Sequence, residues 1–206
     1  MSVLKVLKDI RLIFGFLLAH LLLYFTFNEK NTVFWYIFIA SMLFLISYAI
    51  FIEEAEKQMR FFSYIIYGAI SGIILYGVFW LGNFLIDLLN ISSLSKEVSS
   101  LYRKMSPRTL WQYFFMFAVI IPGEEIFWRG FVQQRLQKLL PVSLSVVLSA
   151  LMYASVQFYS DTIVLPVAAF VAGLIWGYLY AWKRSIQLVI VSHMVFNALL
   201  LIILPL

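Results

Sequence analysis

The sequence predicts an all-α fold, a polytopic bundle of about seven transmembrane helices. Hydrophobic residues make up 64% of the 206 positions and charged residues only 12%, with a mean hydropathy of +0.96. Soluble domains are closer to half apolar and a quarter charged. Seven apolar segments each reach the ~20 residues that a membrane-spanning helix needs. Their limits are 10–27, 33–52, 61–86, 109–127, 141–159, 162–182 and 186–205.

The distribution of Lys and Arg favours an inside N-terminus, because these residues collect in cytoplasmic loops. In that orientation ten of the fifteen cations fall on the inside and five on the outside. We expect the outside stretch 92–108, SSLSKEVSSLYRKMSPR, to form a short amphipathic helix. The stretch 131–140, FVQQRLQKLL, predicts an interfacial amphipathic helix after the fourth span. No linker or repeat divides the chain, so we expect 1–206 to form one membrane domain.

Composition also excludes several classes of site. The chain has no Cys, which rules out disulfides, thiolate catalysis and cysteine metal ligands. Its net charge of +5 is explained by the cytoplasmic loops. Nucleic-acid binding needs a clustered basic patch, and no basic run with interleaved aromatics occurs. We therefore expect membrane lipids as partners and no nucleic acid.

The stretch PGEEIFWRGF, residues 122–131, places three ionisable groups in an apolar setting. Glu125 and Arg129 are four residues apart, so they share a helix face and can pair. Glu124 is rotated from Glu125 by about 100° at ~3.6 residues per turn, and so faces a different environment. Such a cluster could also mark the end of a span, with the acids in headgroup water. The predicted topology puts the cluster near the inner end of the fourth span. Acids followed by apolar aromatics favour an intramembrane functional site instead.

Two further segments carry polar residues at helical spacing. In SHMVFNALL, His193 and Asn197 share one face of the last span, which favours a polar site. In ALMYASVQFYSD, Tyr153 and Gln157 share a face but alone look like ordinary residues near a helix end. His20, in FLLAHLLL, has no Asn one turn along the helix as His193 has, and we interpret it as structural.

Together these segments resemble the CAAX protease and bacteriocin-processing (CPBP or Abi) family of intramembrane proteases. The stretch EEIFWRG matches the family signature E-E-x-x-x-R, and His193 with Asn197 matches its motif H-x-x-x-N. The approach to His193 is also similar, including the Gly-x-x-x-Gly at Gly173 and Gly177. The resemblance covers roughly 108–202, which leaves 1–107 as N-terminal spans. The family's second motif is an aromatic residue, three further residues and then a His. Tyr153 fills the aromatic position, but Gln157 stands where the family has the His.

The resemblance implies the following roles. Glu124 would be the general base that activates water, and Glu125 with Arg129 a supporting pair. His193 and Asn197 would be oxyanion donors. Gln157 would replace a base by a neutral amide, which can orient a water but cannot take up its proton. The available ligand set is poor for zinc, which generally needs three good protein ligands plus water. We therefore expect no metal and no cofactor.

Three functions follow as hypotheses. The leading one is an intramembrane endopeptidase that acts on a membrane-associated peptide or protein, in a cavity open to the cytoplasm. The second is a catalytically impaired relative that binds a peptide or membrane protein, for example in bacteriocin immunity. The third, a small transporter or channel, has little support because no inverted repeat and no ring of charges occurs. We expect an integral multi-pass protein of a bacterial cell membrane.

Overall fold

A computed structural model of the chain describes residues 6–29, 31–53 and 59–206. Three of the cations counted for the orientation, Lys5, Lys30 and Lys57, lie outside these ranges. The described residues form helices and contain no strand. This confirms the predicted all-α class, and the inside N-terminus stays a prediction.

Six helices in the described ranges are long and apolar enough to cross a membrane. Six labelled helices supply most of the length of these spans, and a short helical turn extends two of the six. The helices are α2 (Ile10–Asn28), α3 (Asn31–Ile52), α4 (Phe61–Leu88), α9 (Val142–Gln157), α10 (Val164–Lys183) and α11 (Ile186–Ala198). The 3-10 helix η3 (Phe158–Ser160) continues α9, and the π-helix η4 (Leu199–Ile203) continues α11. The limits follow the predicted segments closely, because long apolar runs define them.

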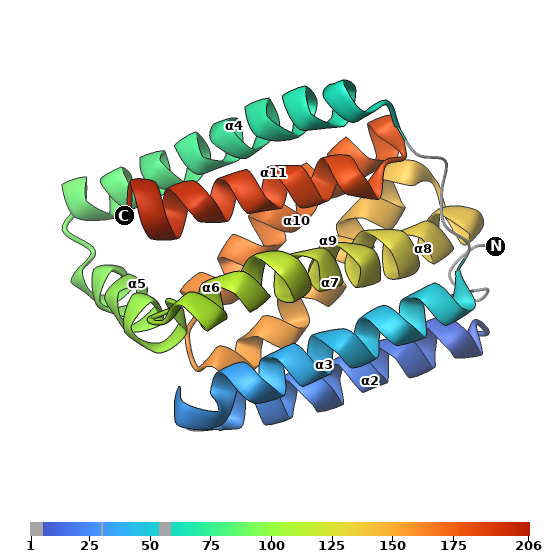
Figure 1. Ribbon diagram of the computed structural model, residues 1–206, viewed down its shortest axis with the longest axis horizontal. Helices are drawn as coiled ribbons and strands as arrows, with labels where there is room; N and C mark the ends of the chain where they lie inside the picture. Colours follow the sequence, from blue (N-terminus) through green and yellow to red (C-terminus); the bar gives the residue numbers. More distant parts are fainter. Residues whose placement is uncertain (1–5, 30, 54–58) are drawn as a thin grey trace.

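The fourth predicted segment, 109–127, is not one of these six. It forms the first part of an unbroken helical stretch from Leu110 to Leu139 that lies centrally in the bundle (Figure 1). Its parts are α6 (Leu110–Phe115), η1 (Met116–Ile120), α7 (Ile121–Glu125), η2 (Ile126–Gln133) and α8 (Gln134–Leu139). The predicted amphipathic stretch 131–140 is therefore largely helical, but it continues the fourth helix directly instead of starting a new one.

The two wide π-helical turns, η1 and η2, flank the acid pair. Pro122 lies between them and has no N–H to donate to the preceding turn, so regular α-helical hydrogen bonding is interrupted here. Wider turns of this type are common at functional sites. The backbone that carries Glu124 and Glu125 is thus locally irregular within an otherwise continuous helix.

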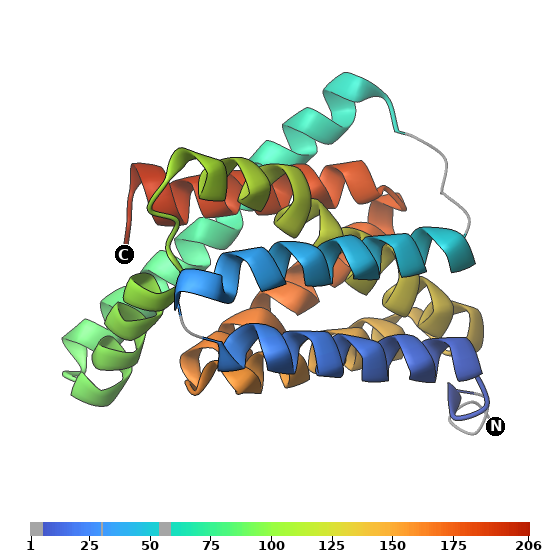
Figure 2. The same cartoon turned by 60° about the horizontal axis from the view of Figure 1, so that its bottom comes forward.

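The remaining helices pack around this central stretch in pairs. Helices α2 and α3 lie side by side on one side, α4 and α11 on the other, and α9 with α10 behind (Figures 1 and 2). Close approach of α4 and α11 depends on small residues, since a Cβ on Gly72 would meet the Ser192 carbonyl oxygen at 2.5 Å. A Cβ on Gly177 would meet Val146 of α9 at 2.8 Å. The predicted role of the Gly-x-x-x-Gly pair in helix packing is consistent with this contact.

The segment between the third and fourth predicted spans forms helix α5 (Ser92–Met105), as expected from its pattern. Glu97 on α5 accepts hydrogen bonds from the backbone N–H groups of Ile163 (2.8 Å) and Val164 (3.1 Å), at the start of α10. Tyr102 donates to the Leu200 carbonyl at 2.9 Å. These contacts hold α5 across the ends of α10 and α11.

Candidate active site

Glu124 lies in the middle of the central helical stretch. The sequence predicted that Glu124 lies near the inner end of the fourth span. The helix continues to Leu139, however, so Glu124 lies near the middle of the helix and not near its end. The residue is 7% exposed, and Oε1 accepts a hydrogen bond from the Tyr153 hydroxyl at 3.2 Å. The acid therefore has a specific polar partner inside the bundle.

Glu125 and Arg129 pair as their spacing predicted. The Arg129 Nη1 lies 3.1 Å from each of the two carboxylate oxygens of Glu125. Both side chains are almost fully buried, at 0% and 1% exposure. The guanidinium also lies 5.0 Å from the Tyr153 ring and 5.3 Å from the Trp176 ring, in the range of cation–π attraction. The pair is thus enclosed by aromatic rings.

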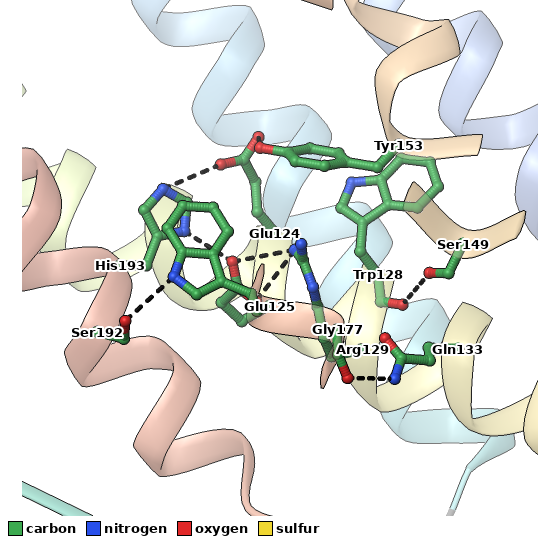
Figure 3. A network of polar contacts seen from close by, with 11 residues as sticks. Glu124, Glu125, Trp128, Arg129, Gln133, Ser149, Tyr153, Gly177, Ser192 and His193 are labelled. Atoms are coloured by element: carbon green, nitrogen blue, oxygen red, sulfur yellow. Dashed lines mark hydrogen bonds and ion pairs between the residues drawn. The ribbon is translucent and has the colours of Figure 1, made fainter. Parts of the chain in front are cut away.

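The two acids meet at opposite nitrogens of one imidazole (Figure 3). The Nδ1 of His193 on α11 lies 2.7 Å from Glu125 Oε1, which is hydrogen-bond distance. The Nε2 of the same ring lies 3.8 Å from Glu124 Oε2. Glu124 is rotated away from the Arg129 pair, as expected, yet both acids converge on His193. Spacing along one helix could not reveal this, because the contact joins residues 68 positions apart.

Trp176 of α10 packs against the face of the His193 ring and so limits its orientation. The two rings stack with centroids 3.9 Å apart and planes inclined by 28°. The indole Nε1 donates to Ser192 Oγ at 3.1 Å, which anchors the Trp to the same helix as His193. Sequence reasoning did not single out Trp176 or Ser192. For Tyr153, the pointers were its place one turn before Gln157 and its match to the aromatic position of the family's second motif.

Gln157 and Asn197 join Glu124, Tyr153 and His193 in lining one cavity of about 210 Å³. This volume exceeds the ~10–15 Å³ that one water needs, so the site has room for water together with part of a substrate. Within the described ranges, the side-chain amides of Gln157 and Asn197 form no hydrogen bond to protein. Both amides are therefore available to a molecule in the cavity.

The rest of the cavity wall is apolar and extends toward α5. Leu101 and Met105 of α5 line it, as do Leu165 of α10 and Leu201 of η4. This is the end of the bundle that carries the 92–108 segment, which the Lys and Arg distribution assigned to the outside. Both the cytoplasmic opening of the cavity and the inside N-terminus stay predictions.

His20 is the other imidazole of the chain, and its polar partners come from another part of the bundle. Its Nδ1 lies 2.9 Å from the Tyr159 hydroxyl and its Nε2 lies 3.1 Å from Ser155 Oγ. Ser155 Oγ also donates to the Met152 carbonyl at 2.7 Å, so its proton is used by its own helix. The cluster therefore joins α2 to α9 and lacks the arrangement of a nucleophile and base.

The residues of this site are a poor match to a metal centre. In residues 6–29, 31–53 and 59–206, no group of three or more His, Asp and Glu side chains is arranged to hold a metal ion. Glu125 already engages both Arg129 and His193, which leaves a poor donor set for zinc. The absence of a metal or cofactor stays a prediction.

Residues 106–199 match the Rce1-like family, described as type II CAAX prenyl endopeptidase Rce1-like. The matched Rce1-like segment contains all six predicted site residues, which are Glu124, Glu125, Arg129, Gln157, His193 and Asn197. No curated protein and no solved structure matches the chain.

The match confirms the family resemblance drawn from the E-E-x-x-x-R and H-x-x-x-N motifs. It supports a CAAX-type membrane protease as the class of protein, with membrane lipids as its environment and a peptide as its substrate. The six apolar helices agree with an integral multi-pass protein. The catalytic roles of the individual residues are a separate question.

Proposed function

We propose that this protein is an intramembrane endopeptidase that hydrolyses a peptide bond of a membrane-associated substrate with a water activated by Glu124. The proposal is supported by the Rce1-like match and by the polar end of the cavity. The observation that carries it is the placement of Glu124. Its carboxylate faces the cavity, while Glu125 alone pairs with Arg129.

The first step is attack by water. Water adjacent to Glu124 transfers a proton to its carboxylate while its oxygen bonds to the substrate carbonyl carbon. The carbonyl becomes an oxyanion, and His193 Nε2 and the Asn197 amide are the candidate donors that stabilise it. Tyr153 holds Glu124 through its hydroxyl and so limits the orientations of the carboxylate.

The second step is departure of the amine. The carbonyl re-forms, the carbon–nitrogen bond breaks, and the leaving nitrogen takes up a proton. Gln157 can orient water or substrate in the cavity but cannot exchange protons. Loss of one acid–base group typically costs ~10²–10⁴-fold in rate, so we expect a slow enzyme.

The test uses purified protein in liposomes with a library of membrane-associated peptides, including peptides that end in a prenylated cysteine. Cleavage products are identified by mass spectrometry for the wild type and for Glu124→Gln, with both proteins shown to be folded by thermal unfolding. We expect cleavage that requires Glu124. Absence of any Glu124-dependent product would refute the proposal.

Gln157 favours a second candidate, a catalytically impaired relative that binds a peptide or membrane protein, as in bacteriocin immunity. Its cavity would then retain a substrate without turnover. Binding of library peptides without cleavage, together with cleavage gained in Gln157→His, would support this candidate. Efficient cleavage by the unmodified protein would exclude it.

A further inference from the structure

The buried site contains two carboxylates but only one group that is always positively charged. Glu124, Glu125, Arg129 and His193 form one connected cluster. Two carboxylates and one guanidinium sum to a charge of −1 if the imidazole is neutral. An unbalanced charge in such surroundings is costly, and none of the four side chains exceeds 10% exposure. One additional proton makes the cluster neutral.

The contacts show which groups can hold that proton. Arg129 is permanently charged, and it pairs with Glu125, which keeps this acid ionised. A carboxylate only accepts hydrogen bonds, so the 2.7 Å contact requires a proton on His193 Nδ1. The additional proton can then reside on either His193 Nε2 or Glu124 Oε2, which are 3.8 Å apart. When Glu124 is ionised and can act as a base, His193 is an imidazolium.

The surroundings of the ring suit a cation. Trp176 stacks on it at 3.9 Å, and the electron-rich face of an indole attracts positive charge. Ser192 accepts the indole hydrogen bond and so fixes the Trp. Charged and titratable groups that face the ring are Glu124 at Nε2 and Glu125 at Nδ1, with Arg129 behind Glu125.

We propose that His193 donates the proton that the leaving amine requires, with Glu125 and Trp176 as positioning residues. This role rests on the proposed peptidase function. Glu124 takes a proton from water as the carbon–oxygen bond forms. The Nε2 proton of the His193 imidazolium passes to the leaving nitrogen as the carbon–nitrogen bond breaks. Proton transfer from Glu124 to His193 then restores the starting state. Gln157 cannot take this role, and His193 is the imidazole among the described cavity-lining residues.

A leaving-group comparison tests the role. The library peptide that is cleaved best is made with its scissile amide and with a matched thioester, whose thiolate leaves without a proton. His193→Gln keeps a hydrogen-bond donor but loses proton transfer. We expect His193→Gln to reduce the rate of amide cleavage ~10²–10⁴-fold. The fold-reduction in the rate of thioester cleavage should be at least ten times smaller. Asn197→Ala is the control, because loss of an oxyanion donor lowers both rates equally.

Equal losses for amide and thioester in His193→Gln would overturn the inference while leaving the peptidase function intact. Failure of the wild type to cleave either substrate in a Glu124-dependent way would instead refute the proposed function. The two failures are therefore distinguishable.

A second readout needs no turnover. The chain has two His, so ¹⁵N-histidine NMR of the protein gives two imidazoles, and His20→Gln assigns them. We expect His193 to be an imidazolium at neutral pH in the wild type. In Glu124→Gln the cluster is neutral without the additional proton, so we expect a neutral ring with the proton on Nδ1. A neutral His193 in the wild type, or no change in Glu124→Gln, would overturn the inference.

Discussion

Oε1 of Glu125 lies 2.7 Å from Nδ1 of His193 and 3.1 Å from Nη1 of Arg129. A buried carboxylate thus connects a cation on its own helix to an imidazole on α11. Removing one partner of such a group leaves a buried charge without compensation, which typically costs 3–5 kcal/mol. The Glu125 carboxylate therefore contributes to stability as well as to the orientation of His193.

We predict that Glu125→Gln lowers the stability of the folded protein by about 3–5 kcal/mol, because Arg129 stays charged and buried. Thermal unfolding in detergent measures this. The double variant Glu125→Gln with Arg129→Met removes both charges, and we expect it to recover part of the stability without recovering activity. If Glu125→Gln alone were as stable as the wild type, the result would contradict the stabilising role of the buried Glu125–Arg129 pair.

Gln157→His should increase the rate of peptide cleavage. Gln157 lines the same cavity as Glu124 and His193, so an imidazole there adds an acid–base group beside the reacting atoms. The increase is measured as kcat/KM on the best library peptide. Gln157→Asn is the matched control, since it changes size without adding a titratable group. A rate unchanged by His would show that Gln157 lies outside the reacting region.

Gly72 and Gly77 on α4 give a matched pair for helix packing. A Cβ at Gly72 would meet the Ser192 carbonyl oxygen at 2.5 Å, whereas nothing lies within 4 Å of a Cβ at Gly77. We predict that Gly72→Ala destabilises by about 1–3 kcal/mol through overpacking and lowers activity by shifting the backbone beside His193. Gly77→Ala should be neutral or stabilising. Equal effects of the two substitutions would contradict the close approach of α4 and α11.

The contact between His20 and Tyr159 should be measurable as a coupling energy. A double-mutant cycle compares the wild type with His20→Leu, with Tyr159→Phe and with the double variant, and each change removes the 2.9 Å contact. Polar contacts between membrane helices average about 0.6 kcal/mol in such cycles, with maxima near 1.7. We expect a value in that range, without loss of Glu124-dependent chemistry. A coupling of zero would show that the cluster does not join α2 to α9.

Asp9, just before α2, predicts that the stability of the fold depends on pH. Burial raises its pKa, but hydrogen bonds and charge from Arg135 and the Leu12 N–H outweigh this and leave the pKa below its ordinary value of 3.8. A lowered carboxyl pKa stabilises the fold above 3.8, and this contribution is lost as the pH falls through the folded-state pKa.

We therefore expect Asp9→Asn to be less stable than the wild type at pH 7, with the difference shrinking below pH 3.8. Unfolding measured between pH 3 and pH 7 tests this, with the exposed Glu29→Gln as control. A difference independent of pH would contradict the pairing of Asp9 with Arg135.

Apolar run lengths were sufficient to locate the helices, because few alternatives to a helix exist for about 20 apolar residues in lipid. Spacing also predicted the Glu125–Arg129 pair, which is a contact within one helix. The continuous helix through residues 110–139 was missed because the polar residues after Arg129 suggested a new surface segment. Phe131, Val132 and Leu136 are in fact fully buried against neighbouring helices.

The spacing of residues along the sequence could not predict contacts between helices. The convergence of both acids on His193, the stacking of Trp176 and the partners of His20 join residues from different helices. Helical spacing gives the face on which a residue lies but not the helix that covers that face. The side on which the cavity opens and the orientation of the N-terminus both stay predictions.

The most direct test of the central claim is the rate at which equal amounts of folded wild type and Glu124→Gln cleave one defined library peptide in liposomes. The account predicts measurable cleavage by the wild type and a loss of at least ~10²-fold in Glu124→Gln, as for a general base. Equal rates in the two proteins would contradict the assignment of Glu124 as the residue that activates water.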